Sequence, residues 1–358
     1  MKTNIERIDK LCENRILSRK DFAILLTSMD NEDEEHLFKT ARAVREKYYG
    51  KKVFLRGLIE FTNYCKNDCY YCGIRRGNKN VVRYRLSDEE IFDCCDNGYK
   101  LSFRTFVLQG GEDMFYSDEH IARIVEGIKK RCPDSAVTLS VGERSRKSYQ
   151  TFFDAGADRY LLRQETSDPS HYAKLHPKEL TIETRKRCLD DLKDIGFQVG
   201  CGIMVGSPYQ TVDNIIDDLF YMHDFEPHMV GIGPFIPHSD TPFRDKKAGT
   251  LADTLHLLGI IRLMLPKVLL PATTALGTIH PTGREMGLSA GANVVMPNLS
   301  PTGVREKYTL YDGKICVGDE INNCLLCLEQ RIKSVGYIPT AGRGDFIGFK
   351  RKQNLTDI

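Results

Sequence analysis

Short apolar or β-branched runs alternate with longer amphipathic stretches through most of the chain. The runs that read as strands are 53–61, 105–108, 136–141, 159–163, 198–205, 229–236, 269–274 and 293–296. The stretches with helical periodicity are 117–130, 145–155, 181–195, 211–223, 251–265 and, most weakly, 284–290, and a capping box at Ser87 to Glu90 begins another helix. Eight strands alternating with helices predict an α/β fold with a parallel sheet that closes into a complete (β/α)8 TIM-type barrel. A doubly wound open sheet is the alternative, although no GxGxxG follows the first run.

The same pattern divides the chain into three predicted parts. Residues 1–50 form a helical N-terminal lead-in, 51–300 the barrel, and 301–358 a loop-rich C-terminal extension with one helix near 327–335. The first fifteen residues are charged and contain no apolar core, so we expect no signal peptide. The most apolar stretch, 255–270, is interrupted by Arg262, Pro266 and Lys267, which excludes a membrane span. We therefore expect a cytoplasmic protein.

Charge and cysteine content narrow the function further. The 358 residues include 51 Lys+Arg and 49 Asp+Glu, a net charge of +2, which argues against a nucleic-acid or membrane-surface partner. Twelve cysteines in a chain without a signal peptide are too sparse for a disulfide scaffold. They indicate metal binding or catalysis instead.

Three of the cysteines follow the first predicted strand: Cys65, Cys69 and Cys72, in the spacing CxxxCxxC. Three thiolates in one loop can hold one face of a metal cluster. A structural zinc site needs four ligands, and no fourth Cys or His lies nearby, so a zinc site would have to be completed from afar. Three thiolates on a four-iron cube leave one iron open, as a catalytic cluster requires.

Further candidates lie at the ends of the later strands. The second strand ends in Gly110-Gly111-Glu112, where glycines permit close backbone approach and a carboxylate can accept a hydrogen bond from an ammonium group. Arg163 and Glu165 close the fourth strand, either as a structural ion pair or as ligand-binding groups at the barrel mouth. The remaining strand ends carry Met204 and Gly206 (fifth), Thr273 and Thr274 (seventh) and Met296 (eighth).

The segment CKNDCYYC, with Tyr71 before its last cysteine, resembles the defining CxxxCxΦC motif of the radical S-adenosylmethionine (SAM) superfamily. The resemblance implies that the three thiolates bind a 4Fe–4S cluster and that Tyr71 lies against the adenine of SAM. It also implies the following SAM contacts: Gly110, Gly111 and Glu112 for the amino group, Arg163 or Arg185 for the carboxylate, Glu165 for the ribose, and Met204 and Gly206 beside the adenine and ribose.

Longer segments, among them VLQGGED, RYLLRQET, PATTALGT and VVMPN, resemble the HydE family of FeFe-hydrogenase maturases, which shares its barrel with biotin synthase and methylornithine synthase. The resemblance runs from about residue 54 to 337. It implies reductive cleavage of SAM to a 5′-deoxyadenosyl radical, which acts on an iron–carbonyl–cyanide–cysteine complex in assembly of the di-iron subsite of the H-cluster. The family positions that line the substrate cavity match Thr273, Thr274, Met296, Tyr308 and Tyr311.

The same resemblance implies sister hydrogenase maturases and an electron donor as partners, and a monomer is plausible. One departure stands out: this chain has Tyr209 where such chains commonly carry a glycine, which puts the turn geometry there in doubt. In the tail, Cys316, Cys324 and Cys327 match an accessory iron–sulfur site of the family, although three thiolates in a loop also suit zinc or adventitious iron.

Two rival functions remain open. A different radical SAM enzyme would act on an organic substrate such as an amino acid or a thiol heterocycle. The residues at the ends of strands seven and eight, in PATTALGT and VVMPN, are those that distinguish the two functions. An iron–sulfur carrier or scaffold would use both cysteine sets and would need neither the Gly-Gly-Glu segment nor Arg163 and Glu165.

Overall fold

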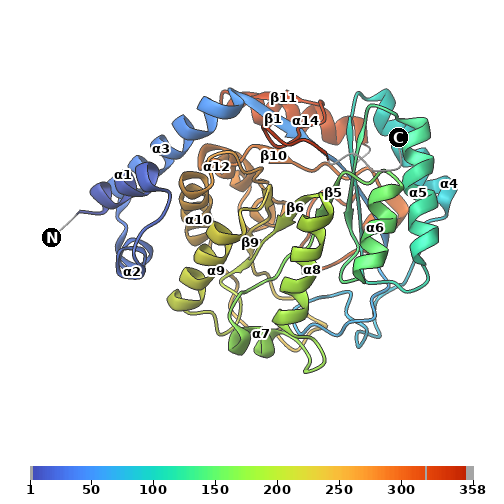
Figure 1. The fold of residues 1–358 in the computed structure, drawn as a ribbon, viewed down its shortest axis with the longest axis horizontal. Coiled ribbons are helices and arrows are strands. Elements are labelled where there is room, and N and C mark those ends of the chain that lie inside the picture. Colours follow the sequence, from blue (N-terminus) through green and yellow to red (C-terminus); the bar gives the residue numbers. More distant parts are fainter. Residues whose placement is uncertain (1–2, 319–320, 352–358) are drawn as a thin grey trace.

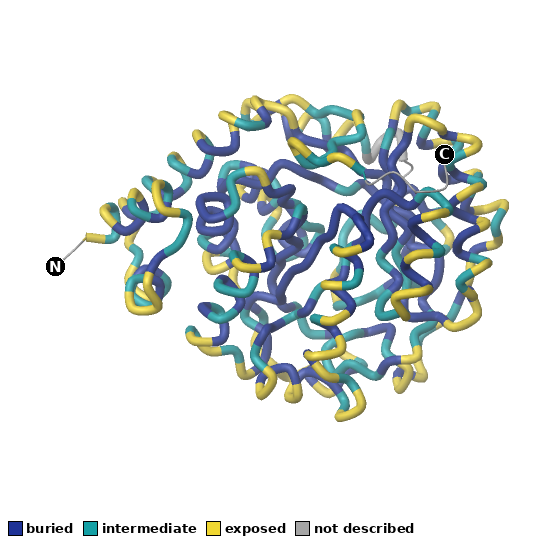
Figure 2. Tube along the Cα trace, in the orientation of Figure 1, coloured by how far each residue is buried: buried dark blue, intermediate teal, exposed yellow. Residues whose placement is uncertain are grey.

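The structure is a computed structural model that describes residues 3–318 and 321–351. Buried parallel strands occupy the centre and helices surround them, as Figure 1 and the burial pattern in Figure 2 show. The strands are β1 (Lys52–Leu55), β2 (Gly57–Thr62), β3 (Thr105–Gly110), β4 (Ala136–Ser140), β5 (Arg159–Leu161), β6 (Gln198–Cys201), β7 (Met204–Val205), β8 (Met229–Val230), β9 (Gly233–Pro234), β10 (Val294–Val295) and β11 (Ile338–Thr340).

The helices around the strands include those that the periodicity predicts and three short ones, at 169–175, 274–279 and 302–305, that it does not. They are α4 (Asp88–Lys100), α5 (Asp118–Arg131), α6 (Arg146–Asp154), α7 (Pro169–Leu175), α8 (Ile182–Ile195), α9 (Val212–Phe225), α10 (Leu251–Met264), α11 (Thr274–Ile279), α12 (Gly283–Ser289), α13 (Thr302–Arg305) and α14 (Ile321–Ser334). The predicted capping box is present, since the Ser87 hydroxyl accepts from Glu90 N–H and the Glu90 carboxylate accepts from Ser87 N–H. Within the described residues, no helix combines the length and apolarity that crossing a membrane requires.

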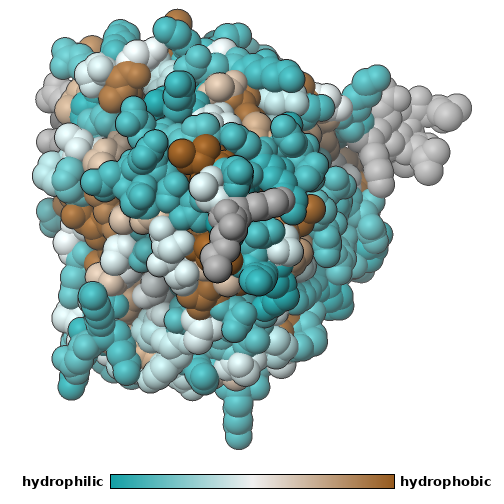
Figure 3. All heavy atoms as spheres, turned by 90° about the vertical axis from the view of Figure 1, so that its left-hand side faces the viewer, coloured by the Kyte–Doolittle hydropathy of each residue, from teal (hydrophilic) through white to brown (hydrophobic). Residues whose placement is uncertain are grey.

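The N-terminal segment is helical, as expected. It contains α1 (Asn4–Asn14), α2 (Arg19–Ser28) and α3 (Asn31–Tyr49), which lie at one side of the molecule. Leu37 of α3 packs on Gly259 of α10, where a Cβ would lie 2.9 Å from Leu37 Cγ. The surface on this side is mostly hydrophilic, with small separate apolar patches (Figure 3).

The parallel sheet is confirmed, but a complete closed barrel is not. Six strands form one sheet in the order β2-β3-β4-β5-β6-β8, and β1 lies between β10 and β11 in a second sheet. Strands β7 and β9 pair separately. The seventh predicted strand is reduced to the isolated bridges Met229–Leu269 and Pro271–Val294, and Leu58–Asn298 is a third bridge. Proline has no N–H to donate, so Pro271 and Pro297 interrupt regular ladders in these two segments.

The C-terminal extension contains a strand that the sequence did not predict. β11 pairs in parallel with β1, and the chain then runs across the barrel end at which the strands begin. There the Arg159 side chain, which is fully buried, donates from Nη2 to Asp345 Oδ1 at 2.6 Å, and Gln198 Nε2 donates to the same oxygen at 2.8 Å. This segment therefore covers the end of the sheet opposite the predicted site.

Candidate active site

The three cysteines lie in the loop that follows β2, as expected. Cys72 N–H donates to Cys69 O at 3.3 Å, and Cys65 Sγ accepts the N–H of Glu112 at 3.4 Å. Burial, and then the nearby Cys65 thiol, raises the pKa of Cys72 to about 12; burial and the other two thiols also raise the pKa of Cys69. Within residues 3–318 and 321–351, no three His, Cys, Asp or Glu side chains have the geometry for a single metal ion. Three neighbouring thiols in one loop are donors that suit an iron–sulfur cluster.

The Gly-Gly-Glu segment packs directly on this loop. A Cβ on Gly111 would lie 2.1 Å from Tyr64 O and 2.8 Å from Cys65 Cβ, so only glycine allows the two loops to approach this closely. The buried Glu112 carboxylate lies 3.3 Å from Lys66 Nζ. A Cβ on Gly142 would lie 1.9 Å from Glu112 Cγ, so this glycine leaves the space that the glutamate side chain occupies.

Arg185 of α8 joins two carboxylates beside the cysteine loop. Its Nε lies 2.7 Å from Glu143 Oε1, and its Nη2 lies 3.8 Å from Glu112 Oε1. Sequence reasoning proposed Arg185 but missed Glu143. The signal was available, because Gly142-Glu143 follows the third predicted strand as Gly-Gly-Glu follows the second.

Arg163 and Glu165 form an ion pair just after strand β5, at the edge of the cavity. Arg163 Nη2 donates to Glu165 Oε2 at 2.8 Å and to Ile203 O at 2.9 Å. Glu165 has φ +65°, a left-handed conformation that is rare away from glycine and is frequent at functional sites. Both the structural and the ligand-binding interpretation of this pair remain compatible with its position on the cavity.

Tyr71 is held by a histidine that the sequence did not reveal. Its hydroxyl lies 3.2 Å from His176 Nε2, and His176 Nδ1 lies 3.0 Å from the carbonyl oxygen of Tyr172. A carbonyl only accepts, so Nδ1 carries the proton and Nε2 accepts the Tyr71 O–H. Burial lowers the pKa of His176 to about 3, which keeps the ring neutral. The ring also stacks on Tyr172 with centroids 3.9 Å apart.

The glycine-rich turn after β7 is held by the side chain of Gln210. Gly206 has φ +69°, and its N–H donates to Gln210 Oε1 at 2.7 Å. Gln210 Nε2 in turn donates to Met204 O at 3.0 Å. Tyr209 has φ +67° and is 51% exposed, so it adopts the left-handed conformation that suits glycine. The tyrosine at this position is therefore strained.

A cavity of about 200 Å³ adjoins part of this arrangement. Four of the five residues predicted for a substrate cavity line it, together with Tyr71, Cys72, Arg163, Glu165 and Met204; the four are Thr273, Thr274, Met296 and Tyr311. Tyr308, the fifth, is buried behind the wall and accepts from Gln109 Nε2 at 3.4 Å, and Gln109 itself lines the cavity.

Two cavity residues that sequence reasoning missed form a buried ion pair. Lys314 Nζ lies 2.6 and 2.8 Å from the two carboxylate oxygens of Glu60 in β2. Asn298 Nδ2 donates to Glu60 Oε2 at 2.8 Å. A charged residue in the apolar run 53–61 was a signal for Glu60, but nothing local pointed to Lys314.

The tail cysteines are only partly described. Cys316 is half-buried with φ +64°, Cys327 is exposed on α14, and the side chain of Cys324 lies outside the described residues. Cys316 and Cys327 both lie close enough to Arg331 to raise its pKa, after the larger effect of its hydrogen bond to Glu285.

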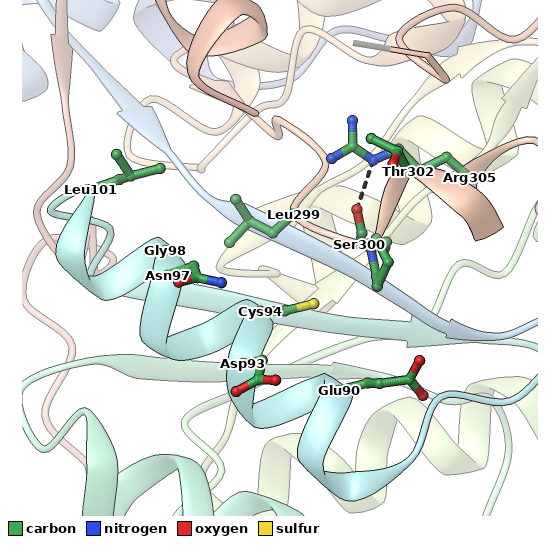
Figure 4. Close-up of a pocket in the computed structure, with 11 residues that line it drawn as sticks. Glu90, Asp93, Cys94, Asn97, Gly98, Leu101, Leu299, Ser300, Thr302 and Arg305 are labelled. Carbon is green, nitrogen blue, oxygen red and sulfur yellow. Dashed lines mark hydrogen bonds between the residues drawn. The ribbon is translucent and has the colours of Figure 1, made fainter. Parts of the chain in front are cut away.

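A separate pocket of about 310 Å³ lies between α4 and the segment 299–305 (Figure 4). Glu90, Asp93 and Cys94 face it from α4, and Arg305 Nε donates to Ser300 O at 2.7 Å on the other side. Apart from Glu90, which belongs to the capping box at the start of α4, none of the residues that line it belongs to a predicted motif.

Comparisons with known proteins agree with this geometry. The family model of the radical SAM superfamily matches residues 59–222. The FeFe-hydrogenase maturase subunit HydE of Thermotoga maritima is 45% identical over 349 residues, which is 98% of each chain. The 3-methylornithine synthase of Methanosarcina barkeri is 32% identical over 343 residues, 94% of each chain. The crystal structure of methylornithine synthase superimposes with a TM-score of 0.82 at 30% identity, covering 93% of this chain and 97% of that one.

Proposed function

Because the chain belongs to the radical SAM superfamily and, within it, to the HydE family of FeFe-hydrogenase maturases, we propose that it is the radical SAM enzyme that acts in assembly of the di-iron subsite of the H-cluster. The observation that carries the proposal is 45% identity to a HydE subunit over 98% of both chains. The cysteine loop, the Gly-Gly-Glu segment and the cavity would supply the groups that this chemistry requires.

Cys65, Cys69 and Cys72 would hold a 4Fe–4S cluster. When bound, the cluster would pass one electron from an external donor to SAM, and the chemistry it supplies is cleavage of SAM to methionine and a 5′-deoxyadenosyl radical. The chain's contribution is to bind and to orient. The Glu112 N–H donates to Cys65 Sγ, and such hydrogen bonds tune iron–sulfur sites.

The residues around the loop divide into binding and positioning roles. Gly110, Gly111 and the Glu112 carboxylate would receive the amino group of SAM. Arg163 would hold the carboxylate of SAM, because it lines the cavity, whereas Arg185 does not. Arg185 instead orients Glu112 and Glu143, to which it is already ion-paired.

The adenosyl part of SAM would lie along the opposite wall. Tyr71, fixed by His176, would lie against the adenine, with Met204 and Gly206 beside the adenine and ribose. Glu165 would accept from the ribose hydroxyls. A walled cavity suits a radical reaction, because it limits the hydrogen atoms within reach.

The proposed substrate is an iron–carbonyl–cyanide–cysteine complex. Thr273 and Thr274 would donate hydrogen bonds to this anionic complex, and Thr273 Oγ1 has no partner in the described residues. Met296 and Tyr311 line the same cavity, and Tyr308 supports it through Gln109.

The experiment uses anaerobically reconstituted protein with SAM and dithionite. It quantifies 5′-deoxyadenosine with and without the synthetic iron–dicarbonyl–cyanide–cysteine complex. We expect the complex to stimulate cleavage or to appear as an adenosyl adduct, and cleavage that is indifferent to the complex would contradict the proposal. A Thr273→Val, Thr274→Val double variant should cleave SAM but fail to activate hydrogenase, whereas Thr27→Val, on exposed α2, should do both.

A second candidate is a radical SAM enzyme that acts on an amino acid. Its support is the 32% identity to 3-methylornithine synthase and the close superposition on a methylornithine synthase structure. SAM cleavage stimulated by a basic amino acid and not by the iron complex would favour it. An iron–sulfur carrier would consume no SAM in either assay.

Several finer points are proposals of the same kind. We propose that the isolated bridges complete a (β/α)8 barrel over 51–300, flanked by a 1–50 helical segment and a 301–358 extension. Cys316, Cys324 and Cys327 would bind a second iron–sulfur cluster. The sister maturases and an electron donor would be partners of a cytoplasmic protein that needs neither nucleic acid nor membrane, and a monomer would suffice.

A further inference from the structure

A small side chamber opens off the substrate cavity near the tail. It shares Glu60, Thr274, Met296 and Lys314 with the cavity wall, and Arg284 of α12 lines its far side. Its volume is about 10 Å³, which is room for one water-sized group. One carboxylate oxygen would fit there while the rest of a ligand remains in the main cavity.

The charges around the two spaces are unequally paired. Arg163 is paired with Glu165 at 2.8 Å, and Lys314 with Glu60 at 2.6 Å. Lys314 also donates to Tyr308 O at 2.9 Å, so its three N–H groups are all used. The cavity and its side chamber are therefore lined by two ion pairs, and in each pair the two charges cancel.

Arg284 is the third cation that lines these spaces, and it differs from the other two. Its Nη2 contacts Thr274 Oγ1 at 3.3 Å and Cys316 Sγ at 3.6 Å, both weak or neutral partners. In the described part of the chain, no carboxylate lies within ion-pair distance of it. A Cβ on Gly277 would lie 3.3 Å from Arg284 Nε, so the glycine makes room for the guanidinium at this position.

We propose that Arg284 is a specificity residue that binds the α-carboxylate of the cysteine carried by the substrate complex. The inference rests on the proposed function, since it concerns the same substrate. A guanidinium presents paired N–H donors that match a carboxylate, and a half-buried site strengthens this interaction relative to water. Thr274, which accepts a hydrogen bond from Arg284, lines both the chamber and the cavity.

The test measures equilibrium binding of two synthetic complexes to cluster-reconstituted protein with SAM and without reductant. One complex carries cysteine, and the other carries cysteamine, which has the same thiolate and amine but no carboxylate. Arg284→Met should weaken binding of the cysteine complex by about 10-fold or more, the loss of a charge-assisted hydrogen bond. It should leave binding of the cysteamine complex within about 2-fold. Arg146→Met, an exposed arginine of α6, is the matched control and should change neither.

Each outcome decides a different point. Equal weakening of both complexes, or none, would overturn the carboxylate assignment. If wild-type protein binds neither complex, both this inference and the proposed function fail. If it binds the cysteine complex but SAM cleavage is not stimulated, the proposed function fails, and the two-complex comparison still decides the role of Arg284. Arg284→Lys provides a second variant should the methionine variant not load its cluster, and it should show a smaller loss with the same selectivity.

Discussion

Replacement of Lys314 by methionine tests whether a buried ion pair with Glu60 of β2 stabilises the packing of the C-terminal extension on the sheet. The side chains of Lys314 and Glu60 are only 8% and 2% exposed, and two N···O distances below 3 Å join them. Methionine preserves most of the volume of the lysine stem and removes the charge. Removing one partner of a buried ion pair typically costs about 3–5 kcal/mol, because the other charge remains buried. We expect a loss of that order in the free energy of unfolding at pH 8.

The loss should depend on pH in a defined direction. Burial raises the pKa of Glu60, and Lys314 and Asn298 lower it again in part. Without Lys314 the folded-state pKa rises further above the unfolded value, so acidification neutralises the buried carboxylate more readily. A raised carboxyl pKa means that stability falls as pH rises above the unfolded pKa. The penalty of Lys314→Met should therefore be smaller at pH 5.5 than at pH 8.

The assay is urea unfolding of anaerobic, cluster-loaded protein, followed by far-UV circular dichroism at both pH values. Lys333→Met is the matched control, since it removes the same group from an exposed pair with Glu329 at 3.5 Å. Such a pair contributes about 0.5 kcal/mol or less. A Lys314→Met penalty no larger than the control, or one that grows on acidification, would refute a buried, charged pair.

Three further predictions concern single residues near the site and in the core. Burial raises the pKa of Asp218 to about 8, so wild-type stability should fall from about pH 4 to pH 8. Asp218→Asn keeps the oxygen that accepts from Ser167 and should remove this slope, about 1.4 kcal/mol per pH unit, in unfolding measured over a pH series. Tyr209→Val should be less stable than Tyr209→Gly by about 1 kcal/mol or more in thermal unfolding, because a β-branched residue is strained at φ +67°. His176→Phe keeps the ring but not the acceptor for Tyr71, and it should weaken SAM binding by about 2- to 10-fold with unchanged iron content; loss of iron instead would contradict a role confined to Tyr71.

The parts of the site that the sequence predicted are those encoded within a few residues of a strand end. The three cysteines fall within eight residues, and Gly110 to Glu112 are contiguous, so knowing that parallel strands end at one edge was enough to bring them together. Arg163 and Glu165 were found by the same logic. These motifs need no knowledge of long-range packing.

What was missed depends on contacts between distant segments. Lys314 and Glu60 are 254 positions apart, and their pairing requires the tail to fold back over the barrel mouth. His176 accepts a hydrogen bond from the hydroxyl of Tyr71, which lies 105 positions earlier in the chain. The sequence analysis predicted a closed barrel, which is not confirmed. An apolar, β-branched run indicates a strand but not how many hydrogen bonds that strand makes with its neighbours. Proline has no N–H to donate, so regular pairing is interrupted at Pro271.

The C-terminal segment that contains β11 and Asp345 also sets the earliest time at which folding of the protein can be completed. Arg159 precedes its partner Asp345 by 186 positions. At the usual speed of translation, the ribosome needs about 10 to 40 s to cover that distance. During this interval Arg159 must remain hydrated, because its carboxylate does not yet exist, and β1 presents an edge on which β11 will later pair. During much of its synthesis the nascent chain therefore has a sheet that is uncovered at the end where its strands begin. The unpaired edge of β1 is then a place where chaperones or misassembly compete with folding.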